Sequence, residues 1–393
     1  MLLAPKVYGM TAGRRLCVPV LALVAGICLS SQELPRGRVI ERVVCGGNEK
    51  QSYALYLPVA YSGERTWPIL YCLDPGARGR TPVERFSAAA ERHGFIVAGS
   101  NNSRNGSNEV VKEAIEWLIQ DTHERFSIDD SHIYTAGFSG GARVALAWAG
   151  NGRVAGVIAC GAGFSRGEIP KDVPFRIFAT AGIDDFNYDE VYAMSRELSR
   201  RGVPVRFAEF SGNHEWLPEN LTSQALDFMV GRLKPEPPPP ESREQKRTAE
   251  LYARYSEELE HGDDSTRRSI IHSLQKDSGR TEDGVARRVA RRVLMGTFIG
   301  AAEEGRRLAE QKKYSDAARA WEVAVLARPA NGQAWYALAV CRAAGKDKRG
   351  ALDALGQAIA NGFRDRDRLE SEPLLDPLRK DPKFIELAGV ITK

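Results

Sequence analysis

Ser139 is the residue whose surroundings most clearly predict chemistry. It stands at the centre of Gly137-Phe138-Ser139-Gly140-Gly141, which fits the pattern GxSxG. In this pattern, glycines leave room for a sharp turn between a strand and a helix, and the turn exposes the serine hydroxyl. The strand-like HIYTAGF leads into the pentapeptide and the helix-like GARVALAWA follows it. We therefore expect Ser139 to be a nucleophile, with a small residue in a structural turn as the alternative.

A serine hydroxyl is a poor nucleophile unless a general base takes its proton. Only one of the six histidines, in FSGNHEW, follows a late strand-like segment on a glycine-bearing loop before residue 233. Such a loop can reach over the end of a sheet to the nucleophile. We predict that this residue, His214, is the general base; the alternative is a solvated loop histidine. The other five are His93, His123, His132, His261 and His272.

A histidine base needs a carboxylate that orients its ring. In the chain order serine, acid, histidine, that carboxylate must lie between Ser139 and His214, directly after a strand. The segment FRIFATAGIDDFNYDE places Asp184 and Asp185 there. We prefer Asp185, because it lies three residues after Gly182; Asp184 is the alternative.

Acyl transfer also requires donors that stabilise an oxyanion. The backbone N–H of Gly140, just after the nucleophile, is one candidate. A second should come from the loop after PILYCLD, where Pro75 has no N–H and leaves Gly76 or Ala77. The alternative is that this loop is a simple surface turn.

Polar residues after another strand-like segment are candidates for substrate binding. In GSNNSRNGSNE, the side chains of Asn101, Asn102 and Arg104 could contact a polar or anionic acyl substituent, although a generic polar turn explains them equally well. Trp216, two residues after His214, is expected either to form a wall of the pocket or to lie in the core.

The elements that position these residues follow from an alternation of strand and helix patterns between residues 37 and 233. Such alternation predicts crossover connections, and hence a mostly parallel sheet with helices on both faces. Helical periodicity covers residues 83–93, 110–125, 140–149, 189–201 and 218–232. The expected strands are RVIERVV, YALYLPV, PILYCLD, FIVAGS, HIYTAGF, VAGVIAC, FRIFATAG and VRFAEF.

A proline-rich stretch, KPEPPPPES, covers residues 234–242 and predicts an extended linker. It separates an α/β domain at 32–233 from a helical domain at 243–393. Within about 298–365, Ala317, Trp321 and Ala324 recur 34 residues later as Ala351, Leu355 and Ala358. This period resembles tetratricopeptide repeats, which would offer a surface for a protein partner. An ordinary helical bundle is the alternative.

The N-terminal stretch has the layout of a secretory signal. Arg14 and Arg15 precede LCVPVLALVAGICLSS, which ends in small residues. We expect residues 1–31 to be removed and the mature chain, without a stable membrane span, to be periplasmic or secreted. The alternative is a single membrane anchor, for which the apolar run is short.

Composition narrows the classes of function further. The chain has 55 basic and 51 acidic residues, a balance that gives no reason to expect a nucleic-acid partner. Cys45, Cys72, Cys160 and Cys341 form no CxxC pair, so we expect neither a metal site nor another cofactor. One disulfide among these four cysteines is compatible with an oxidising compartment.

Residues 37–233 resemble the α/β-hydrolase superfamily, and within it the secreted esterases of the polyhydroxybutyrate depolymerase and feruloyl esterase type, with a distant likeness to dienelactone hydrolases. GFSGG, GIDDFNY, GNHEW and the loop after PILYCLD carry the likeness. It implies an eight-stranded sheet and a serine hydrolase that cleaves small or polymer-derived carboxylic esters through an acyl-enzyme. Many members have His-Gly where this chain has Asp74-Pro75. A serine peptidase, or a non-catalytic interaction protein that uses the helical repeats, remains the alternative.

Overall fold

The structure is a computed structural model, and it describes residues 34–165, 168–279 and 283–391. Residues from Arg36 onward group into one compact unit. The segment predicted to be a secretory signal, residues 1–31, lies outside the described residues.

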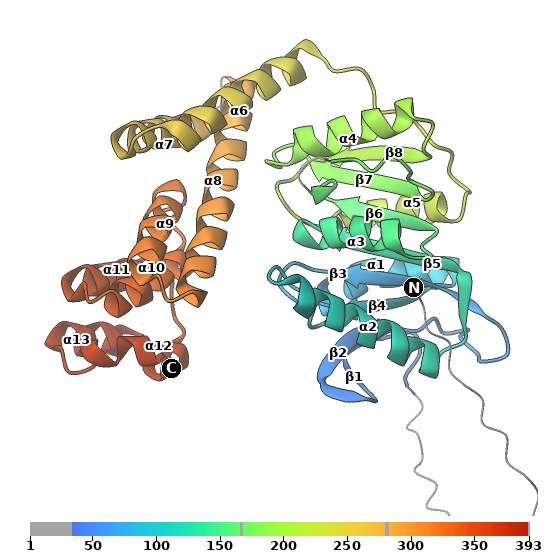
Figure 1. Ribbon diagram of the computed structural model, residues 1–393, viewed down its shortest axis with the longest axis horizontal. Helices are drawn as coiled ribbons and strands as arrows, with labels where there is room; N and C mark the ends of the chain where they lie inside the picture. Colours follow the sequence, from blue (N-terminus) through green and yellow to red (C-terminus); the bar gives the residue numbers. More distant parts are fainter. Residues whose placement is uncertain (1–33, 166–167, 280–282, 392–393) are drawn as a thin grey trace, which may run out of the picture. The chain divides into compact units, whose positions relative to one another are not determined.

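The first half of the described chain forms an eight-stranded sheet (Figure 1). Its strand order is β1-β2-β4-β3-β5-β6-β7-β8. The β1/β2 and β2/β4 pairs are antiparallel and every later pair is parallel. The strands are β1 (Val39–Cys45), β2 (Asn48–Tyr56), β3 (Trp67–Leu73), β4 (Ile96–Ser100), β5 (Ile128–Phe138), β6 (Gly156–Cys160), β7 (Arg176–Gly182) and β8 (Val205–Phe210).

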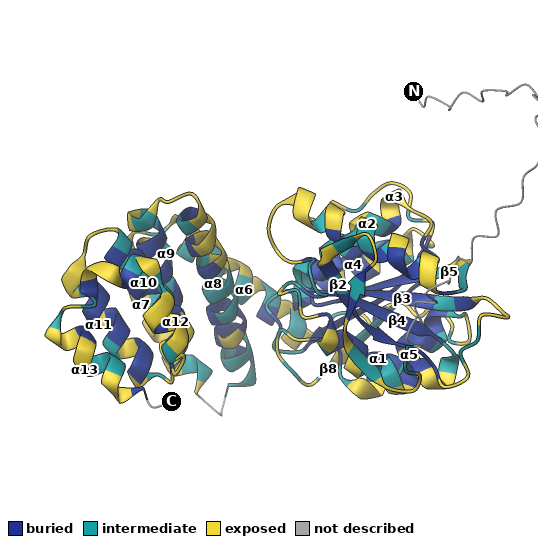
Figure 2. Ribbon diagram, turned by 90° about the horizontal axis from the view of Figure 1, so that it is seen from below, coloured by how far each residue is buried: buried dark blue, intermediate teal, exposed yellow. Residues whose placement is uncertain are grey.

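Five helices cover both faces of this sheet: α1 (Arg80–His93), α2 (Asn108–Arg125), α3 (Gly140–Asn151), α4 (Tyr188–Arg200) and α5 (Glu219–Met229). Buried side chains of α1 and α5 pack on one face, and those of α3 and α4 on the other, with α2 beside them. Figure 2 shows the buried strands between these layers. The mostly parallel sheet with helices on both faces, predicted from the sequence, is confirmed, and its strand order is that of the α/β-hydrolase fold.

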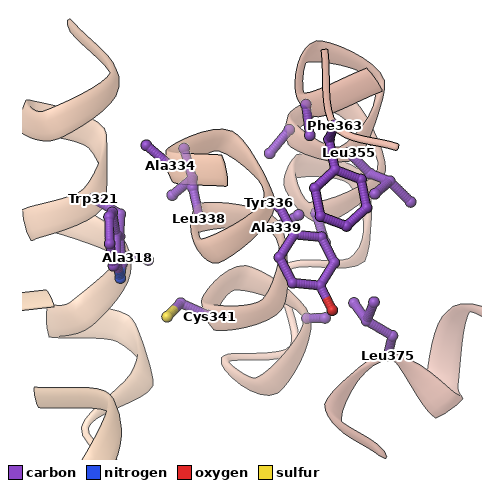
Figure 3. Close-up of a cluster of buried hydrophobic side chains, with 14 of the residues drawn as sticks. Ala318, Trp321, Ala334, Tyr336, Leu338, Ala339, Cys341, Leu355, Phe363 and Leu375 are labelled. Carbon is purple, nitrogen blue, oxygen red and sulfur yellow. The ribbon is translucent and has the colours of Figure 1, made fainter. Parts of the chain in front are cut away.

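The later part of the chain is helical: α6 (Arg243–His261), α7 (Asp264–Ser278), α8 (Gly284–Glu310), α9 (Tyr314–Ala327), α10 (Gly332–Ala344), α11 (Lys348–Ala360), α12 (Arg366–Ser371), a 3₁₀ turn (Pro373–Leu378) and α13 (Pro382–Val390). Trp321 and Leu355, which are related by the 34-residue period, both lie in its hydrophobic core (Figure 3). The likeness to tetratricopeptide repeats stays a prediction.

No helix among the described ranges is long and apolar enough to cross a membrane. The four cysteines predicted to remain in the mature chain are all buried free thiols, and no disulfide joins them. Burial raises the pKa of the Cys160 thiol to about 12 and that of Cys341 to about 11. Within 34–165, 168–279 and 283–391, no group of three or more His, Cys, Asp or Glu side chains could hold a metal ion.

Candidate active site

Ser139 occupies a tight turn between β5 and α3. Its backbone has φ +53° and ψ −122°, a conformation that costs a non-glycine residue on the order of 1–3 kcal/mol. The flanking glycines explain how the chain accommodates the turn. A Cβ on Gly137 would lie 2.1 Å from the carbonyl oxygen of Gly141, and a Cβ on Gly141 would lie 2.0 Å from that of Leu73. Any larger residue at either position would force the backbone apart.

His214 and Asp185 join Ser139 in a continuous chain of hydrogen bonds. His214 Nε2 lies 2.8 Å from Ser139 Oγ, and His214 Nδ1 lies 2.9 Å from Asp185 Oδ1. The Asp185 side chain is fully buried and that of His214 is 6% exposed. When Nδ1 carries the proton and donates to Asp185, Nε2 is free to accept from the serine hydroxyl.

The neighbouring aspartates have different partners. Asp185 Oδ1 accepts a second hydrogen bond, of 2.8 Å, from the backbone N–H of Asn187. Asp184 Oδ2 instead accepts from Nη1 of Arg291, at 2.9 Å, on the exposed side of the loop. The structure therefore brings Asp185 to His214, and Asp184 to an arginine of α8.

Two aromatic rings hold the His214 imidazole. The Phe138 and Phe186 rings lie 4.6 Å and 4.3 Å from it, centroid to centroid, each tilted by about 45°. Phe138 immediately precedes Ser139, and Phe186 immediately follows Asp185. The sequence neighbours of these two residues therefore pack against the imidazole ring of His214. Sequence reasoning did not single out Phe186, whose role depends on a contact between distant loops.

The oxyanion candidates are arranged unequally. Gly140 begins α3, so its N–H is among the amides that a helix leaves without an intrahelical partner. In contrast, the N–H of Gly76 donates to Asp74 Oδ1 at 2.8 Å, and that of Ala77 donates to the Asp74 carbonyl at 3.1 Å. Ala77 also has a positive φ, +58°. The loop after β3 is thus tightly folded on Asp74.

The polar residues after β4 divide into two groups. Asn101 Nδ2 donates to the carbonyl of Glu41, and Asn102 makes hydrogen bonds with Ser52 N and the Lys50 carbonyl, so both amides tie the loop to the first two strands. Arg104 is exposed and forms a β-bridge with Gly76.

Asn105, which we did not select from the sequence, lies against the turn that carries Ser139. A Cβ on Gly140 would meet its Oδ1 at 1.9 Å. The backbone N–H of Asn105 donates to the Pro75 carbonyl at 2.9 Å. The only feature of the sequence that indicated Asn105 was its place in the same polar run as Asn101 and Asn102. That feature does not tell which of the three asparagines lies beside Ser139.

Trp216 is 4% exposed and donates through Nε1 to Asp74 Oδ2 at 2.9 Å. Its ring lies 5.9 Å from that of Phe138. Trp216 is therefore a buried residue of the loop that carries His214, and it packs against Asp74 of the loop after β3.

Comparison with known proteins gives no match to a family model and none to a curated protein. Solved structures do match about half of the chain, at low sequence identity. The chain is similar to FphF, a fluorophosphonate-binding serine hydrolase of Staphylococcus aureus (16% identity, 46% of this chain and 92% of that one, TM-score 0.39). It is also similar to the S-formylglutathione hydrolase FrmB of the same organism (16%, 50% and 99%, 0.40). A ferulic acid esterase is 18% identical in sequence; the match covers 49% of this chain and 97% of that one, with a TM-score of 0.41. The eight-stranded, mostly parallel sheet itself defines the class of the fold.

Proposed function

We propose that the chain is a serine hydrolase that cleaves carboxylic esters through an acyl-enzyme. The observation that carries the proposal is the unbroken hydrogen-bonded chain from Ser139 Oγ through His214 to the buried Asp185. A serine held on a strained turn with a histidine on its hydroxyl is the arrangement that activates an otherwise weak nucleophile.

The proposed reaction has two steps. Ser139 Oγ attacks the ester carbonyl carbon while His214 Nε2 takes the hydroxyl proton, and the Gly140 N–H stabilises the oxyanion. The tetrahedral intermediate collapses, the C–O bond to the alcohol breaks, and Nε2 returns the proton to the leaving alcohol. Water then attacks the acyl-enzyme in the same way and releases the acid. Asp185 keeps the imidazole oriented and stabilises its protonated form throughout.

The test is turnover of a panel of p-nitrophenyl esters of increasing acyl length, beside peptide anilides, by the full chain and by Ser139→Ala. We expect ester hydrolysis that Ser139→Ala lowers by on the order of 10⁴-fold or more. Hydrolysis of anilides without hydrolysis of esters would replace the esterase by a serine peptidase of the same fold. Turnover that Ser139→Ala leaves unchanged would exclude both.

The remaining proposals concern the ends of the chain. Residues 1–31 act as an export signal that leads to a periplasmic or secreted protein. In this segment a pair of arginines precedes an apolar run, and the run ends in small residues. Residues 243–393 act as a helical domain with tetratricopeptide-like repeats that binds a protein partner. Fractionation of cells that express the chain, with the N-terminus of the exported form read by mass spectrometry, tests the first proposal. A mature N-terminus before residue 20 would contradict it.

A further inference from the structure

Asp74 is a buried acid for which the proposed mechanism has no use. It follows β3 directly and is 1% exposed. A buried carboxylate is costly unless donors compensate it. Here Oδ1 accepts from the Gly76 N–H and from Nε of Arg78, both at 2.8 Å, and Oδ2 accepts from Nη2 of Arg78 at 3.1 Å and Nε1 of Trp216 at 2.9 Å.

These donors belong to two loops that flank the nucleophile. Gly76 and Arg78 lie between β3 and α1, the loop expected to supply an oxyanion donor. Trp216 lies 142 positions after Asp74 and two positions after His214, between β8 and α5. The Asp74 carboxylate is thus the group that joins the loop beside the proposed oxyanion site to the loop of the proposed base.

The last residue of β3 and the loop that carries His214 both lie against the turn that carries Ser139. The carbonyl oxygen of Leu73, immediately before Asp74, lies where a Cβ on Gly141 would come within 2.0 Å. On the other side, the Phe138 ring contacts both Trp216 and His214, at 5.9 Å and 4.6 Å between centroids. A shift of either loop would therefore alter the surroundings of the serine.

We propose that Asp74 is a positioning residue of the active site, which sets the loop after β3 beside Gly140 and holds the His214 loop over Ser139. The inference rests on the proposed hydrolase function. Because the N–H groups of Gly76 and Ala77 both donate to Asp74, this residue determines how that loop faces the oxyanion. A misplacement of about 1 Å costs on the order of 100-fold in rate.

Two conservative variants test the role. Trp216→Phe keeps a ring in the core but removes the N–H that reaches Asp74. Asp74→Asn keeps the side-chain volume, but its amide –NH₂ group replaces one carboxylate oxygen and can no longer accept the hydrogen bonds made to that oxygen. We expect each to lower kcat for ester hydrolysis by about 10- to 100-fold while KM changes by less than about twofold. In the double variant Trp216→Phe/Asp74→Asn, the fold loss in kcat should be smaller than the product of the losses in the two single variants. Both substitutions remove the same hydrogen bond between Trp216 and Asp74.

Asp121 provides a matched control. It is 2% exposed and accepts from a glycine N–H (Gly46, 2.7 Å), an arginine four positions later (Arg125, 2.7 Å) and an aromatic donor (Tyr53 Oη, 2.7 Å). These donors lie on β2, on α2 and in the turn before β2, away from the loops around Ser139. Asp121→Asn should therefore lower the melting temperature about as much as Asp74→Asn but leave kcat unchanged.

The outcomes separate the inference from the proposed function. If the wild-type chain hydrolyses esters and the Asp74→Asn and Trp216→Phe variants keep its kcat, the inference is overturned and the hydrolase stands. If Asp121→Asn lowers kcat as much as Asp74→Asn, Asp74 is merely structural and the inference is also overturned. A wild-type chain without turnover of any ester or anilide removes the proposed function, and the positioning role with it.

Discussion

Arg292 of α8 donates through Nη2, at 2.6 Å, to the carbonyl oxygen of Ile183, two residues before Asp185. Its Nη1 lies 3.1 Å from Asp189 Oδ2, just beyond the same loop, and the whole residue is 2% exposed. The loop that presents Asp185 to His214 is therefore held by a buried guanidinium from the helical part of the chain. Burial lowers the pKa of Arg292, while Asp189 opposes that effect.

We expect Arg292→Met to lower the free energy of unfolding by about 3 kcal/mol, because it leaves Asp189 and the Ile183 carbonyl without their donor. Chemical denaturation monitored by circular dichroism measures this change. Arg291→Ala is the control: its exposed pair with Asp184 is worth less than about 1 kcal/mol. Equal effects of the two variants would contradict a role for the buried contact.

The two adjacent aspartates should differ sharply in their effect on catalysis. Asp185→Asn is expected to lower kcat by on the order of 10⁴-fold, because an amide at this position favours the wrong tautomer of His214. Asp184→Asn should leave kcat within about twofold, since its carboxylate faces arginines of α8. Initial rates with a chromogenic ester distinguish them, and a larger loss in Asp184→Asn would assign the acid to the other residue.

Two glycines of α8 test the packing of the helical part. A Cβ added to Gly305 would come 2.7 Å from Nε1 of Trp321 in α9. A Cβ added to Gly300 would have no atom within 4 Å. We expect Gly305→Ala to lower the free energy of unfolding by about 1–3 kcal/mol through overpacking. Gly300→Ala should raise it by up to about 1 kcal/mol, because alanine restricts the unfolded chain. Thermal unfolding of the pair decides, and a stabilised Gly305→Ala would contradict the close approach of α8 and α9.

The thiols should be unreactive in the folded protein. Burial raises the pKa of Cys45 to about 11, of Cys160 to about 12 and of Cys341 to about 11, and the pKa of the buried Cys72 also lies well above its usual value. Because the thiolate is the reactive form, we expect none of these four to be labelled by Ellman's reagent at pH 8 before denaturation. After denaturation all four should react. A smaller number would indicate a disulfide.

Much of the α/β fold could be predicted from the sequence because its signals are local. Apolar runs marked every strand, although β2 begins at Asn48, five residues before the apolar YALYLPV, since its first residues form a solvated hairpin with β1. The pattern of apolar residues alone cannot predict where a strand with a polar, solvent-exposed end begins.

The contacts that complete the site could not be predicted in the same way. Asp74 and Trp216 are 142 residues apart, and neither matches a motif that indicates their hydrogen bond. Asn105 was indistinguishable from Asn101 and Asn102, because their different partners depend on how the loop crosses the sheet edge. Ser139, Asp185 and His214 could be selected as candidates from the sequence because each directly follows a strand-like segment, and the carboxyl ends of parallel strands meet at one edge of the sheet.

The most direct test of the central claim is covalent labelling of the intact chain with a fluorophosphonate, followed by peptide mapping. The account predicts a stoichiometric adduct on Ser139, formed slowly in His214→Ala and not at all in Ser139→Ala. An unlabelled wild-type chain, or an adduct on another residue that persists in Ser139→Ala, would contradict it.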